Sequence, residues 1–232
     1  MNQLEPLERE DQEAFLDLPF RLREAVAGQV IVEEGEHSHS CIGLLSGFTY
    51  RHRTLRNGAR QIISVHVPGD FPDLQSGLLG VAIHTLQMLT PGRLALFQAD
   101  ELQRLVSERP AIRNALWRET LIDTSISGEW VANVGRRDAR GRIAHLLCEF
   151  AMRLRAAGLL EGDSYELPMT QEQMADATGL TPVHVNRTLQ EMRRAGLIHT
   201  ERRKVSVADW ARLAALGDFD PQYLHLEADQ RS

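Results

Sequence analysis

Residues 167–207 constrain the fold more than any other part of the chain. They read as a helix over 171–177, a tight turn containing Gly179 and a second helix over 181–195. Gly179 tolerates the backbone conformation that a sharp reversal between two helices requires. A helix, a tight turn and a second helix are typical of proteins whose second helix enters the major groove of DNA.

Both helices begin at recognisable capping residues. Thr170 and Gln173 have the spacing of a capping box, in which each side chain binds the backbone N–H of the other residue. Thr181 is an N-cap residue, and Pro182 after it suits the first position of a helix. These signals predict where each helix starts.

The second helix separates into an apolar face and a polar face. Val185, Leu189 and Met192 recur at helical spacing and predict the inner face. Arg187 lies on the other face, where a guanidinium can bind guanine through two hydrogen bonds. The residues expected to contact double-stranded DNA are Thr170, Thr181, Pro182, Val183, His184, Asn186, Arg187, Gln190, Arg202, Arg203 and Lys204.

Residues 199–207 predict a two-stranded hairpin, or wing, whose tip carries Arg202, Arg203 and Lys204. Basic side chains at such a tip suit the phosphate backbone of DNA. The whole chain has a net charge of -6, but residues 136–212 hold 13 basic and 10 acidic residues, so the acidic excess lies elsewhere. DNA binding is therefore predicted for the C-terminal part of the chain.

The N-terminal half contains short apolar segments separated by turn residues, which is typical of an antiparallel β domain. Asn57-Gly58 lies between two of the segments and is the strongest hairpin signal in the chain. The predicted strands are 29–33, 41–45, 48–55, 61–67, 85–89 and 93–97.

A long apolar stripe follows Pro110 and predicts one long helix. We expect this helix to form a homodimer, although a helix packed on its own domain is the alternative. Asp138 is expected to cap the next helix and to act as a hinge between the two. The predicted dimer interface consists of Ile112, Leu116, Ile122, Ile126 and Trp130.

These segments predict an α+β chain with an N-terminal antiparallel β-roll of the jelly-roll type and a C-terminal winged helix-turn-helix. A length of 232 residues suits two domains with separate cores. The predicted parts are a β-roll sensor domain over 1–109, a dimerisation helix and hinge over 110–137, a DNA-binding domain over 138–212 and a C-terminal tail over 213–232.

The motif residues resemble the Crp/Fnr superfamily of bacterial transcription regulators, which includes the cyclic-AMP receptor. The resemblance rests on Asp138, Gly141-Arg142-Ile143-Ala144, Leu180-Thr181-Pro182, Val185-Asn186-Arg187-Thr188-Leu189 and Gly196-Leu197-Ile198, with Gly35-Glu36, Gly47 and Pro68-Gly69-Asp70-Phe71 in the β domain. It implies a homodimer on a near-palindromic site, with each recognition helix in one of two successive major grooves, and contact with RNA polymerase.

The chain departs from the family at the residues that bind cyclic nucleotides. Family members that bind them carry a Gly-Glu pair and, about ten residues later, an Arg-Ser or Arg-Thr pair. No arginine lies between Arg60 and Arg93 here. A buried phosphate would lack its cation, so we do not expect cyclic AMP and the effector stays unknown. The candidate effector cavity is formed by Asp70, Asp73, Ser76 and Ser127.

Other cofactors have weaker signals. An iron–sulfur cluster of the FNR type needs N-terminal cysteines, and none precedes Cys41. His66 and His84 leave haem open as an alternative, and a haem- or nucleotide-binding sensory module whose helix-turn-helix contacts protein is the second functional hypothesis. Glu36, His37 and His39 are expected in a solvated turn, so no metal site is predicted.

Composition narrows the class of protein further. No apolar run approaches the roughly 18 residues that a membrane span needs, and residues 1–20 lack the basic start and apolar core of a signal peptide. Cys41 and Cys148 form no CxxC pair, so we expect two packing thiols in a cytoplasmic protein. Because no nucleophile–base arrangement, phosphate-binding loop or metal pair is present, an enzyme is not expected.

Overall fold

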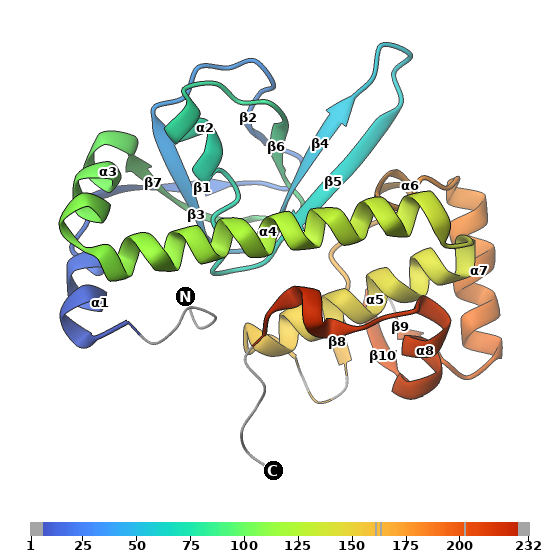
Figure 1. The fold of residues 1–232 in the computed structure, drawn as a ribbon. Helices are drawn as coiled ribbons and strands as arrows, with labels where there is room; N and C mark the ends of the chain where they lie inside the picture. Colours follow the sequence, from blue (N-terminus) through green and yellow to red (C-terminus); the bar gives the residue numbers. More distant parts are fainter. Residues whose placement is uncertain (1–6, 161, 163, 202, 227–232) are drawn as a thin grey trace. The chain divides into compact units, whose positions relative to one another are not determined.

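The computed structural model describes residues 7–160, 162, 164–201 and 203–226. The chain divides into two compact units, residues 1–123 and 124–232, and the long helix α4 (Pro110–Arg136) contributes to both. Figure 1 shows the elements of each unit. Among the described residues, no helix has the length and apolar character needed to cross a membrane.

The first unit contains the predicted antiparallel β-roll, built from two sheets with the strand orders β1–β7–β3 and β2–β6–β4–β5. Strand β1 lies at the edge of the first sheet and is not among the predicted strands. The strands are β1 (Phe20–Ala25), β2 (Val30–Val32), β3 (Ser40–Ser46), β4 (Thr49–Thr54), β5 (Arg60–His66), β6 (Thr85–Met88) and β7 (Gly92–Gln98).

The predicted hairpin at Asn57-Gly58 is confirmed and joins β4 to β5. Gly58 adopts a φ of 84°, which explains why a glycine is needed there. The Asn57 side chain accepts a hydrogen bond of 3.0 Å from the Ala59 backbone N–H, and Leu55 N–H donates to the Ala59 carbonyl at 2.8 Å. Local hydrogen bonds therefore close this turn.

Helices complete the core of the first unit: α1 (Arg9–Leu16), α2 (Leu74–Leu79), α3 (Ala99–Glu108) and the first part of α4. Ile112 and Leu116 of α4 pack in one cluster with Phe15, Leu102 and Phe97. The long helix is therefore part of the core of this unit as well as a connection.

The structure does not support the predicted dimer interface, because its five residues are buried within the protomer. Ile112, Leu116, Ile122, Ile126 and Trp130 are each less than 9% exposed. The alternative, a helix that packs on its own chain, holds for this face of α4. The large apolar side chains that α4 leaves exposed are different ones, Trp117, Leu121 and Val131.

The second unit contains the predicted helix-turn-helix, formed by α6 (Gln171–Thr178) and α7 (Pro182–Arg194). Helix α5 (Ala139–Ala156) precedes it, with Asp138 as its N-cap. The wing is three-stranded rather than two-stranded, because β8 (Ser164–Glu166) pairs with β10 (Lys204–Val207) on the side opposite β9 (Ile198–Glu201).

The predicted C-terminal tail is folded as far as residue 226. It contains most of α8 (Trp210–Gly217) and the short helix η1 (Pro221–Leu224), and both contact α5. Gly217 allows α8 to approach α5 closely, since a Cβ atom at this position would lie 2.6 Å from the His145 backbone nitrogen. The approach is between backbones, which cannot move aside as a flexible side chain can.

We therefore expect Gly217→Ala to lower the free energy of unfolding by about 2 kcal/mol, because the added methyl group overpacks a backbone contact. Urea denaturation followed by circular dichroism measures this quantity. Ala215→Ser, at an exposed position of the same helix, is the matched control and should change stability by less than about 0.5 kcal/mol. Equal stabilities of the two variants would show that α8 does not pack on α5 this closely.

Candidate nucleic-acid interface

The helix-turn-helix is held by the predicted caps. Gln173 N–H donates to Thr170 Oγ1 at 3.2 Å while Thr170 N–H donates to Gln173 Oε1 at 2.9 Å, which forms the capping box. Thr181 Oγ1 accepts from the His184 N–H at 3.3 Å and caps α7. Gly179 ends α6 with a φ of 64°, as the tight turn requires.

Arg142 braces this turn against the start of α5. Its NH1 group donates to the Thr178 carbonyl at 3.0 Å, and its Nε donates to the Arg137 carbonyl at 2.9 Å. Helix C-terminal carbonyls lack partners inside their own helix, so an arginine is well suited to bind them. The sequence motif contains Arg142, but only the folded chain shows this positioning role.

The recognition helix α7 buries its predicted inner face. Val185, Leu189 and Met192 are buried. Arg187 is exposed and, within the described part of the chain, has no hydrogen bond or ion pair. Its guanidinium has five N–H donors and no acceptor within the described part of the chain, so it is available to bind an acceptor on another molecule.

A ladder of amide groups connects the two helices. Gln190 Nε2 donates to Asn186 Oδ1 at 2.9 Å, and Asn186 Nδ2 donates to Gln171 Oε1 at 3.1 Å. Asn186 is half-buried. Its amide is therefore oriented by the two neighbouring side chains, which the one-dimensional pattern of α7 does not reveal.

The described part of the wing tip carries two of the three predicted basic residues. Arg203 is exposed and donates to the Pro168 carbonyl at 3.2 Å. Lys204 is exposed at the start of β10. Arg202 lies outside the described residues.

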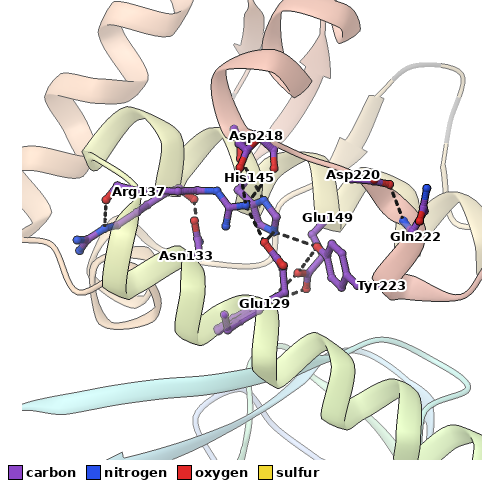
Figure 2. Close-up of polar contacts among 12 residues, drawn as sticks. Glu129, Asn133, Arg137, His145, Glu149, Asp218, Asp220, Gln222 and Tyr223 are labelled. Carbon is purple, nitrogen blue, oxygen red and sulfur yellow. Dashed lines mark hydrogen bonds and ion pairs between the residues drawn. The ribbon is translucent and has the colours of Figure 1, made fainter.

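A buried carboxylate organises the junction between α4, α5 and the C-terminal segment (Figure 2). Glu149 is 1% exposed and accepts hydrogen bonds from Trp130 Nε1 at 2.9 Å, from the Tyr223 hydroxyl at 2.8 Å and from Arg153 at 3.4 Å. Burial and the neighbouring Glu149 charge raise the pKa of Tyr223. The buried carboxylate therefore has hydrogen-bond donors from three different elements, as buried polar groups require.

His145 lies beside this carboxylate on the same helix. Its Nδ1 faces the Gly217 carbonyl at 3.2 Å, so Nδ1 carries the proton, and its Nε2 lies 3.0 Å from the Tyr223 hydroxyl. The carboxylate of Glu129 lies 3.8 Å from Nε2. Burial lowers the pKa of His145 below its ordinary value, which outweighs the opposite effect of the two glutamates.

The residues between α4 and α5 are held in place. Asp138 accepts a hydrogen bond of 2.7 Å from the Gly141 N–H, as its predicted capping role requires. Arg137 donates to Glu129 at 2.7 Å and to the Asp218 carbonyl at 3.0 Å. The hinge role of Asp138 stays a prediction, since one arrangement of the junction does not show a movement.

Comparisons with known proteins agree with this geometry. Residues 141–216 match the Crp-like helix-turn-helix domain, and residues 22–109 match the cyclic nucleotide-binding domain. The chain is 31% identical over 191 residues to the transcriptional activator protein FnrL of Cereibacter sphaeroides, a match that covers 81% of this chain and 76% of that protein. This chain belongs to the Crp/Fnr superfamily. It is a DNA-binding transcription regulator.

Other relatives of this Crp/Fnr regulator support the assignment. It is 29% identical over 192 residues to the nitrogen fixation regulation protein FixK of Bradyrhizobium diazoefficiens, covering 82% of this chain and 79% of that protein. The solved structure of FixK2 from Bradyrhizobium japonicum superposes with a TM-score of 0.79 at 23% identity, covering 86% of this chain and 98% of that one. At this identity the structural likeness shows the shared fold.

The two aspartates predicted to line the effector cavity of this regulator bind backbone groups of their own chain. Asp70 and Asp73 accept hydrogen bonds from the backbone N–H groups of Val67 and Ser76, and so serve local turns. Asp73 Oδ2 is buried without a partner, and burial raises the pKa of this carboxyl group. An anionic phosphate bound here would bring further negative charge to a site where the Asp73 carboxyl group already lacks a hydrogen-bond donor. Ser127 belongs to the second unit, so the predicted cavity stays a prediction.

A buried arginine is present in the β-roll, but it comes from β4 and lies before the stretch between Arg60 and Arg93 that lacks an arginine. Arg51 donates to Asp123 at 2.5 Å and to Ser64 Oγ at 2.8 Å. The Asp123 carboxylate therefore already neutralises its charge. His66, a candidate haem ligand, lies 3.0 Å from the same hydroxyl through Nε2.

The remaining candidates have ordinary structural surroundings. His84, the second candidate haem ligand, is half-buried, and burial lowers its pKa. His37 donates to the Gly80 carbonyl through Nδ1 at 3.1 Å. Cys41 and Cys148 are free and buried, and burial raises the pKa of each thiol to about 12. Both thiols are therefore packing groups, as predicted.

Protonation of His145 should destabilise the fold. Because its pKa is lower in the folded chain than in the unfolded chain, the unfolded chain binds the proton more tightly. The stability contributed by the neutral ring is present above about pH 6.5 and is lost as the pH falls towards the folded-state pKa. Urea denaturation from about pH 8 to about pH 5 measures the effect.

His145→Gln provides the comparison, because glutamine does not titrate. The difference in free energy of unfolding between wild type and variant should shrink as the pH falls below about 6.5. His84 also has a lowered pKa and is present in both proteins, so its contribution cancels. A difference that stays constant over the whole range would contradict the assignment of a neutral His145.

Proposed function

We propose that this Crp/Fnr regulator binds a near-palindromic DNA site as a homodimer, with α7 of each subunit in a major groove, and that it acts on transcription through RNA polymerase and not as an enzyme. The observation that carries the proposal is Arg187, which is exposed on α7 without an internal partner, opposite a buried apolar face. Exposed Arg203 and Lys204 on the wing supply phosphate contacts.

The exposed face of α4 supports dimerisation through residues other than those predicted. Trp117, Leu121 and Val131 are more than half exposed. Together with four further exposed positions they form a series with steps of three and four residues, the heptad spacing of two helices packed side by side. The full set is Asn114, Trp117, Leu121, Thr124, Gly128, Val131 and Gly135.

The two glycines in this set are informative. A Cβ atom at Gly128 or Gly135 would meet nothing within 4 Å, so the protomer does not require them. Glycine inside a helix costs about 1 kcal/mol relative to alanine. A second α4 helix that approaches closely at these positions gives them a purpose, and we define the set as the α4 seam.

Charges in the α4 seam should therefore separate the subunits. Leu121→Asp combined with Val131→Asp should give a folded monomer, because like charges would face one another across an apolar contact. Analytical ultracentrifugation measures the mass, and circular dichroism checks the fold. Leu79→Asp, at a position 71% exposed on α2, is the control and should remain dimeric. A dimeric double variant would exclude this seam.

Arg187 and Arg203 should have different roles in DNA binding. Arg187→Ala should cost about 1–3 kcal/mol per half-site and remove the preference at one base pair, because a two-pronged guanine contact carries sequence information. Arg203→Ala should weaken binding to all sequences alike. It should also reduce the slope of log binding constant against log salt concentration by about one unit. Selection from a randomised palindrome library, followed by titration at several salt concentrations, separates the two roles.

The same experiment tests the proposed function as a whole. If Arg187→Ala kept the wild-type motif with wild-type affinity, α7 would not be the helix that reads DNA. If the wild-type protein selected no motif at all, sequence-specific binding would be excluded under those conditions and the proposal would fail.

A further inference from the structure

The first turn of α7 presents an apolar surface to solvent. Val183 is 76% exposed, and Pro182 before it has no N–H group to donate. His184 after it has its Nδ1 3.2 Å from Thr181 Oγ1. The first turn of the recognition helix therefore exposes the isopropyl group of Val183 between Pro182 and His184. His184 is hydrogen-bonded to the N-cap residue Thr181.

The stability of the free protein does not explain a valine at this position. A β-branched residue is a poorer helix former than glutamate, and the positive end of the helix dipole favours an acidic side chain in the first turn. The side chain of Val183 is mostly exposed, so it adds little to the core. The gain from this valine is expected in a bound state.

Position and chemistry together identify the bound group. Val183 and Arg187 are four residues apart, so their side chains lie on the same face of α7 about one turn, or about 5.4 Å, apart. Successive base pairs are about 3.4 Å apart, so a base met by Val183 lies one or two pairs from the guanine met by Arg187. The apolar group displayed in the major groove is the C5-methyl group of thymine.

We propose that Val183 recognises a thymine through its C5-methyl group, one or two base pairs from the guanine bound by Arg187. A carboxylate at this position could accept a hydrogen bond from the amino group of cytosine, whereas valine has no acceptor. The half-site thus contains a thymine where a chain with an acidic residue would select a cytosine. This inference rests on the proposed function.

The test removes only the C5-methyl group of thymine from the DNA and leaves the protein unchanged. The motif selected by the full-length protein is synthesised with deoxyuridine in place of each thymine in turn, in both half-sites, and dissociation constants are measured by fluorescence anisotropy. At one position the wild-type protein should lose about fourfold in affinity per half-site, which corresponds to the burial of one methyl group. A 5-methylcytosine at that position should bind more tightly than cytosine for the same reason.

Variants connect the effect to the side chain. In Val183→Ala, thymine and deoxyuridine at that position should bind within about twofold of each other, since most of the contact is gone. Val26→Ala, at a valine that is 66% exposed in the first unit, is the matched control and should keep the full methyl dependence. Because Val183 is exposed, its replacement leaves the core intact, and circular dichroism checks this.

The outcomes separate this inference from the proposed function. A wild-type protein that depends on Arg187 for its motif but is indifferent to every deoxyuridine would overturn the thymine contact and leave the regulator proposal standing. A methyl dependence that persists in Val183→Ala would also overturn it, because another residue would then make the contact. A wild-type protein without any sequence preference would overturn both.

Discussion

The second unit depends on the burial of one negative charge. Glu149 is almost completely buried, and its carboxylate accepts hydrogen bonds from three elements: Trp130 of α4, Arg153 of α5 and Tyr223 of η1. Removing one partner of a buried charge costs far more than an exposed ion pair contributes, since the charge is left without solvation. The end of the long helix, the start of the DNA-binding domain and the C-terminal segment are therefore stabilised together.

Arg142 extends this arrangement to the helix-turn-helix. Its guanidinium connects the Arg137 carbonyl, at the junction, with the Thr178 carbonyl at the end of α6. The carbonyl of Arg142 itself accepts from the Asn133 side chain of α4 at 3.3 Å. A change in the geometry of the α4–α5 junction would thus act directly on the turn that orients α7. This is a physical route by which a regulator can alter the presentation of its reading helix.

The long helix shows how two interfaces can share one amphipathic segment. One face packs Ile112 and Leu116 into the protomer, while Leu121 and Val131 are exposed on another. Large apolar side chains therefore lie on both faces of the helix. The buried cation of the β-roll is Arg51 of β4, and it is paired with Asp123 of α4.

The sequence by itself determined the features that depend on neighbouring residues: the caps at Thr170 and Thr181, the turn at Gly179 and the hairpin at Asn57-Gly58. These signals suffice because each hydrogen bond or backbone conformation involves residues within a few positions of one another. They also sufficed for the family and for the general location of the reading helix.

Only the tertiary structure decided which apolar face of α4 is core, and which polar residues meet. Periodicity identifies a face but does not distinguish packing against the same chain from packing against a partner, so the burial of Ile126 within its own protomer could not be predicted. The Arg51–Asp123 pair joins residues 72 positions apart, and the Tyr223–Glu149 pair joins residues 74 positions apart. Such contacts leave no periodic trace in the sequence, because they form only when distant segments are brought together by the core.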